Sequence, residues 1–182
     1  MFIAQQLRKN NIAEYLLYMW QIEELIRAYQ LDMEKINQYI ISPYPIDEEK
    51  KKTLYEWYES LIEMMRSEDV VNKGHLQLNK NTMKQLEEFH VELYKDNSSK
   101  TSDYKRAYHQ IQSTLINIRK QLAETSIGDI EVCFTFLFGI MVLNMQKKNI
   151  SETTKEAQKV ITSFLKSFSE YFNQYELGEL QF

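Results

Sequence analysis

The stretch NIAEYLLYMWQIEELIRAY, residues 11–29, decides the fold class. Its apolar residues fall on nearly every side of a helix instead of forming one stripe, and Asn10 or Asn11 can cap the helix at its start. A helix that is apolar on several sides has to be covered on several sides. We therefore expect a central helix with other helices packed around it.

The rest of the chain predicts helices as well. Its 182 residues include only 4 Gly and 2 Pro. Turns are rich in these two residues, so the chain has few turns and long regular elements. Both prolines lie in SPYP, residues 42–45, which is the clearest break. We predict an all-α, irregular bundle in a single domain over residues 1–182, with six long helices and one short helix.

The hydrophobic spacing places these helices. The polar segment DNSSKTS, residues 96–102, is expected to be a mobile surface loop. The helix from Asp129 to Lys148 is apolar all round and is predicted to be the most buried. The other predicted helices span residues 11–29, 32–41 (the short one), 47–67, from Asn79 or Asn81 to 95, 103–123, and from Ser151 onward.

Composition excludes several classes of protein. The net charge of −4 carries no basic excess, which argues against nucleic acid as a partner. The longest apolar run, residues 132–145, is shorter than the roughly 20 residues that a membrane span needs. A lone Cys133 and the absence of a signal-like start indicate a cytoplasmic protein.

Four strings are distinctive in their order and spacing: residues 11–29, EWYESLIEMM (56–65), GHLQLNKN (74–81) and CFTFLFGIMVL (133–143). Together they resemble an uncharacterised bacterial family of helical proteins of similar length, classed as a domain of unknown function. The resemblance covers nearly the whole chain. It implies a helical, single-domain protein and transfers no activity, cofactor or catalytic residue.

Two charged residues of the first helix are candidates for a binding site. Glu23 and Arg27 are four residues apart and share one strip of the helix with Trp20. One interpretation is a structural ion pair that fixes the helix register. The other is a pocket in which Arg27 binds an anion.

His75 is the best single candidate for function, because it lies beside Gly74 in a connector and titrates near neutral pH. The competing interpretation is a loop whose polar side chains satisfy nearby helix ends. If a pocket exists, we expect it near Glu23, Arg27, Trp57 and His75.

Two other patterns favour structural interpretations. The carboxylates Glu56, Glu59 and Glu63 lie opposite an apolar stripe, so they predict a solvated face. Glu87-x-x-His90 is half of the motif of di-iron carboxylate proteins, but the second Glu-x-x-His is missing. We therefore predict no metal site, no cofactor and no catalytic residue.

The absence of catalytic signatures favours a non-catalytic, protein-interaction or regulatory protein over an enzyme. The abundant Tyr and Met suit binding surfaces, and a homodimer is the simplest assembly. The alternative is a small-molecule-binding protein or enzyme with a pocket near the four candidate residues.

Overall fold

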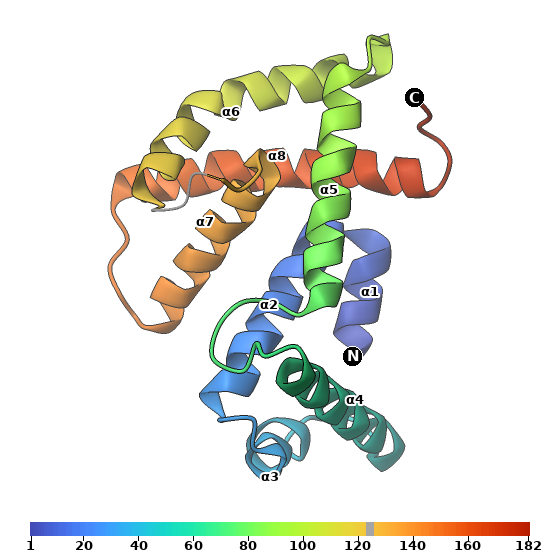
Figure 1. The fold of residues 1–182 in the computed structure, drawn as a ribbon, viewed down its shortest axis with the longest axis vertical. Coiled ribbons are helices and arrows are strands. Elements are labelled where there is room, and N and C mark those ends of the chain that lie inside the picture. The colour runs from blue at the N-terminus through green and yellow to red at the C-terminus, as the bar shows by residue number, and fades with distance from the viewer. Residues whose placement is uncertain (123–125) are drawn as a thin grey trace.

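The computed structural model describes residues 1–122 and 126–182, and it confirms the all-α prediction: the described residues contain no strand. The described residues form eight α-helices, a π-helical turn and a 3-10 turn (Figure 1). Their bounds are α1 Phe2–Asn10, α2 Ile12–Ala28, α3 Met33–Ile36, η1 Asn37–Ile41, α4 Glu48–Ser67, α5 Gln77–Lys95, η2 Ser99–Thr101, α6 Ser102–Gln121, α7 Asp129–Met145 and α8 Glu152–Glu176.

Most predicted helix starts are confirmed by side-chain caps. The Asn11 side chain accepts hydrogen bonds from two backbone N–H groups at the start of α2, Asp47 accepts one in α4, and Ser151 accepts one in α8. Each cap satisfies a backbone donor that has no partner inside the helix. The local sequence was sufficient to place these starts.

The structure differs from the prediction at two places and leaves a third untested. Residues 2–10 form the additional helix α1, which was not predicted because its apolar residues are few. Helix α5 begins at Gln77, before Asn79, whose side chain bonds another helix instead of capping its own. The predicted end of α6 at Ala123 lies outside the described residues.

The segment 96–102 is more ordered than the expected loop. Its residues 99–101 form the 3-10 turn η2, and Ser102 already begins α6. The Thr101 side chain is fully buried and donates its hydroxyl to the Asp96 backbone carbonyl and carboxylate. The polar side chains of residues 96–102 therefore form hydrogen bonds within a turn.

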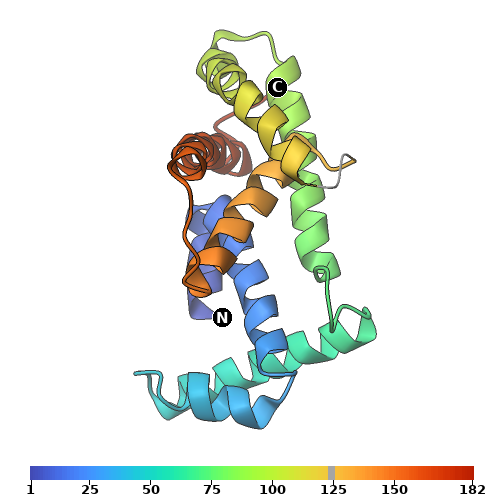
Figure 2. The same cartoon turned by 90° about the vertical axis from the view of Figure 1, so that its left-hand side faces the viewer.

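Two apolar cores lie along α2. One core is formed mainly by α5, α6, α7 and α8, and the other by α3, η1 and α4 (Figures 1 and 2). Helix α2 reaches both, with Leu16 and Trp20 in the first core and Ile22 and Ile26 in the second. This double role explains why its sequence is apolar on nearly every side.

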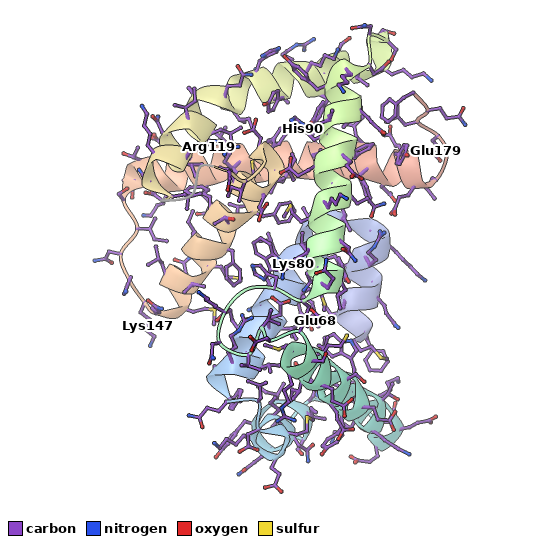
Figure 3. All side chains as sticks on the ribbon, in the orientation of Figure 1. Glu68, Lys80, His90, Arg119, Lys147 and Glu179 are labelled. Carbon is purple, nitrogen blue, oxygen red and sulfur yellow. The ribbon has the colours of Figure 1, made fainter. Side chains whose placement is uncertain are left out.

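The prediction that the helix beginning at Asp129 is the most buried is wrong for its second half. Ile130, Val132, Cys133 and Phe134 are fully buried in α7, but Met141–Leu143 are half-exposed. This half extends away from the bundle toward Lys147, which Figure 3 labels beyond the end of α7. Sequence hydrophobicity alone does not distinguish an apolar helix that is covered from one that is not.

The helices of the described residues are short or carry polar side chains along their length. In none of these helices is the apolar stretch long enough to cross a membrane.

Candidate functional site

Three of the four candidate residues meet where α2 faces the connector between α4 and α5. Glu23 and Arg27 project from α2 toward this connector, and His75 lies at its end, just before α5. Glu23 is only 1% exposed, which is rare for a carboxylate and requires partners for its oxygens.

The partners of Glu23 come from the start of α5. Its Oε2 lies 2.6 Å from His75 Nδ1. Its Oε1 accepts a 2.9 Å hydrogen bond from the Leu76 backbone N–H and a 2.6 Å bond from Asn79 Nδ2. Leu76 is the N-cap residue of α5 and has no capping side chain of its own. Glu23 therefore caps α5 from another helix.

Arg27 holds the other end of the connector. Its Nη2 donates to the Val70 carbonyl at 2.9 Å and to the Gly74 carbonyl. Gly74 has φ +87°, a left-handed conformation that favours glycine. The predicted Glu23–Arg27 ion pair does not form, since Arg27 Nη1 pairs with Glu24 at 2.5 Å instead. Both residues bind the connector, not each other.

His75 packs against the side of α2. Its ring stacks on the Trp20 indole, with 4.0 Å between centroids and 14° between planes, and its edge faces Phe138 of α7. A carboxylate on Nδ1 is also how catalytic triads orient a histidine. Among the described residues, however, no serine, threonine or cysteine side chain hydrogen-bonds His75, so the pair lacks a nucleophile.

Two buried polar atoms beside this pair have no hydrogen-bond partner within the described residues, Trp20 Nε1 and Asn79 Oδ1. Trp20 was singled out from the sequence, but the role of Asn79 was missed. The only available signal for this role was that Leu76, the residue before α5, has a side chain that cannot cap a helix.

Trp57 does not join this site. It lies on α4, half-buried against the Tyr58 ring, and lines a groove between α1 and α4. On the same helix, the carboxylates of Glu56, Glu59 and Glu63 are exposed to solvent, as predicted.

A second polar cluster lies at the start of α7. Glu87 of α5 accepts a 2.7 Å hydrogen bond from the Glu131 backbone N–H. Arg119 Nη2 lies 2.6 Å from the Asp129 carboxylate, which also accepts the Tyr108 hydroxyl proton. Although burial opposes the shift, these two donors lower the pKa of Asp129. The cluster joins α5, α6 and α7 and was not recognised in the sequence, because its members are far apart in the chain.

His90, one turn from Glu87, is a satisfied core histidine, as expected. It is 8% exposed and its Nδ1 bonds the Tyr104 hydroxyl. Burial lowers the pKa of His90 and raises that of the Cys133 thiol. Within residues 1–122 and 126–182, no three His, Cys, Asp or Glu side chains are grouped closely enough to hold a metal ion. In Figure 3 this cluster lies near the labelled His90 and Arg119, far from the connector, which follows the labelled Glu68.

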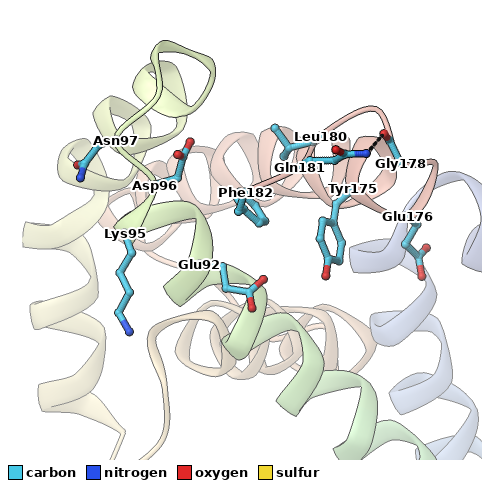
Figure 4. A pocket seen from close by; sticks show the side chains of 10 residues that line it. All are labelled: Glu92, Lys95, Asp96, Asn97, Tyr175, Glu176, Gly178, Leu180, Gln181 and Phe182. Carbon is cyan, nitrogen blue, oxygen red and sulfur yellow. Dashed lines mark hydrogen bonds between the residues drawn. The ribbon is translucent and has the colours of Figure 1, made fainter.

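A groove of about 1040 Å³ separates the end of α5 from the end of α8 (Figure 4). Glu92, Lys95 and Asp96 line one side, and Tyr175 and Glu176 line the other. Charges of both signs face this open space, and Glu176 already pairs with Arg8. The groove thus has no single charge preference.

Comparison with known proteins gives a family and no function. No curated protein and no solved structure matches the chain significantly. The model of one family, described as a domain of unknown function, matches residues 1–179. Because this match covers nearly the whole chain, the protein belongs to the DUF4924 family.

Proposed function

We propose that this protein acts by binding another protein chain and not by catalysis, and that the outer half of α7 is the contact. The observation that carries the proposal is an apolar helix end that its own fold leaves half-exposed. The Glu23 site supports the same view, because the carboxylate and the Arg27 guanidinium are both occupied in holding the connector.

The outer half of α7 carries no charge. From Val132 to Met145 the helix contains no Asp, Glu, Lys or Arg. Met141, Val142 and Leu143 are half-exposed, Met145 is 62% exposed, and within the described chain none of the four belongs to either apolar core. Met145 is the exposed member of the four, and its three neighbours are partly buried; an uncovered apolar surface of this kind is typical of interaction sites.

Gly139 adds a second property to this surface. A Cβ placed on Gly139 would meet no atom within 4 Å. Glycine inside a helix costs about 1 kcal/mol relative to alanine, and no close contact inside the chain requires it here. A bare helix backbone lets a second helix approach closely, which is consistent with an interface at this position.

The occupant that we propose is a second copy of the chain. A charged partner surface would bury its charges against α7 without partners, which is costly. The same uncharged helix from a second copy avoids this cost, and a two-fold axis places identical patches together. In an antiparallel pair, Lys147 and Lys148 of the two copies lie at opposite ends of the contact and do not repel each other.

We also place the protein in the cytoplasm. The support is the free thiol of Cys133, buried in α7, since free cysteines are typical of a reducing compartment.

Light scattering at micromolar concentration tests the proposal. We expect twice the 21.9 kDa mass of one chain for the unaltered protein. Val142→Glu should give the mass of one chain, because it buries a charge in the contact. Ile116→Glu is the matched control: Ile116 is 55% exposed on α6, and this variant should keep the doubled mass. Circular dichroism checks that both variants fold. A single-chain mass for the unaltered protein, or for both variants, refutes the proposal.

A further inference from the structure

A separate groove, distant in sequence from α7, lies between α1 and α4 and measures about 660 Å³. This volume lies within the range of small-molecule sites, about 300–1000 Å³. Met19 and Leu61 are buried and line it, and the half-buried Trp57 and Met64 line it as well. Methionine and tryptophan suit a binding surface, because methionine adapts its shape and tryptophan offers a large apolar face.

The charged side chains that line this groove are both basic, Arg8 and Lys9 of α1. Arg8 is neutralised by Glu176 of α8, with two hydrogen bonds of 2.7 Å. Lys9 is exposed and forms no ion pair with any residue that the structure describes. The lining of this apolar groove thus includes an ammonium group without an ion-pair partner among the described residues.

We infer that this groove binds a single-chain amphipathic carboxylate, the chemistry of a free fatty acid. The acyl chain lies along Met19, Trp57, Leu61 and Met64, where each buried methylene contributes about 0.8 kcal/mol. The carboxylate lies at Lys9, whose ammonium donates a charge-assisted hydrogen bond. The apolar lining complements the acyl chain of such a ligand, and the unpaired ammonium group of Lys9 complements its carboxylate.

The groove is a better candidate than the Glu23 site for a small ligand. At the Glu23 site the carboxylate and the guanidinium already bind backbone groups of the connector. In the groove, Lys9 is available, and Trp57 and Met64 are only half-buried. Trp57, expected from the sequence to belong to a pocket, lies here without the other three candidates.

Titration with decanoate below its micelle concentration tests the inference, followed by Trp57 fluorescence and by calorimetry. We expect saturable binding. Trp57→Phe should remove most of the fluorescence change and weaken binding, because Trp57 contacts the acyl chain, while calorimetry still detects the weaker binding. Decyltrimethylammonium, with the same chain and the opposite charge, should bind at least tenfold more weakly.

Lys9→Glu should weaken decanoate binding at least tenfold, and Lys9→Arg should restore it. Lys166→Glu on α8 is the matched control, since it changes the net charge equally at an exposed position outside the groove, and it should bind like the unaltered protein. The inference is overturned if decanoate does not bind, if both amphiphiles bind equally, or if Lys9→Glu and Lys166→Glu behave alike. Because Val142 lies outside this groove, Val142→Glu should leave decanoate binding unchanged whatever it does to the oligomeric state.

Discussion

Glu23 and Glu87 perform the same structural task at two places in the molecule. Each projects from one helix and accepts a backbone N–H at the start of another: Glu23 of α2 at α5, and Glu87 of α5 at α7. In the described part of the chain, α5 and α7 begin without a side-chain cap of their own. Two carboxylates thus join α2 to α5 and α5 to α7 through space, whereas α2, α3, α4 and α8 begin with a local side-chain cap.

The surroundings of the two carboxylates differ. Glu23 has a histidine and an amide as neighbours and is 1% exposed. Glu87 is half-buried, and burial first, then the negative charges of Asp129 and Glu131, raise its pKa. At the first junction, groups from the start of α5 bind both oxygens of the Glu23 carboxylate. At the second junction, Glu87 lies near two other acidic side chains, Asp129 and Glu131.

The largest change in the free energy of unfolding is expected from removing the carboxylate of Glu23. Glu23→Ala leaves the Leu76 N–H and the Asn79 amide buried without an acceptor, and we expect a loss of about 3–5 kcal/mol in the free energy of unfolding. The matched control is Glu24→Ala, since Glu24 is its partly exposed neighbour and pairs with Arg27. That variant should lose no more than about 1 kcal/mol. Urea unfolding followed by circular dichroism measures both, and equal losses would show that Glu23 is not a junction.

A smaller effect is expected from crowding the second carboxylate. A Cβ on Gly128, the N-cap residue of α7, would overlap the Glu87 carboxylate, although the backbone there is extended and accepts any residue. Gly128→Ala should cost about 1–3 kcal/mol. Gly139→Ala is the control, measured in the Val142→Glu background that removes the proposed contact, and should stabilise the single chain by up to about 1 kcal/mol, because no atom of the described chain lies within 4 Å of its Cβ.

A double-mutant cycle identifies the cause of the Gly128 effect. If the overlap is responsible, Gly128→Ala should cost clearly less in a Glu87→Ala background, since the carboxylate is no longer there. An unchanged cost in that background would assign the effect to the backbone of Gly128 and not to Glu87.

The two junctions also mark how far the sequence could be interpreted. The starts of α2, α4 and α8 could be predicted because the cap of each, Asn11, Asp47 or Ser151, is next to its helix in the chain. The role of Glu23 could not be predicted in full, because its partner Leu76 is 53 residues away. The exposure of Met141–Leu143 was missed for the same reason: whether an apolar helix is covered depends on distant segments.

The smallest change in the free energy of unfolding is expected from neutralising the carboxylate of Glu87. Burial, opposed in part by the Glu131 N–H and reinforced by nearby acids, raises the pKa of Glu87 above its ordinary value of 4.5. Above pH 4.5 the folded protein therefore binds more protons at Glu87 than the unfolded chain does, and this residue's contribution to stability falls as the pH rises.

Glu87→Gln removes this titration but keeps a carbonyl oxygen that can accept the Glu131 N–H. The stability of Glu87→Gln relative to the unaltered protein should therefore increase from pH 4.5 toward neutrality. His90, whose lowered pKa acts in the opposite direction below pH 6.5, is present in both proteins and cancels in the difference. Urea unfolding at intervals across this pH range measures the change. A relative stability that is constant or decreases with pH would mean that the Glu87 carboxylate is stabilised by its neighbours as Glu23 is, and the contrast between the two junctions would be lost.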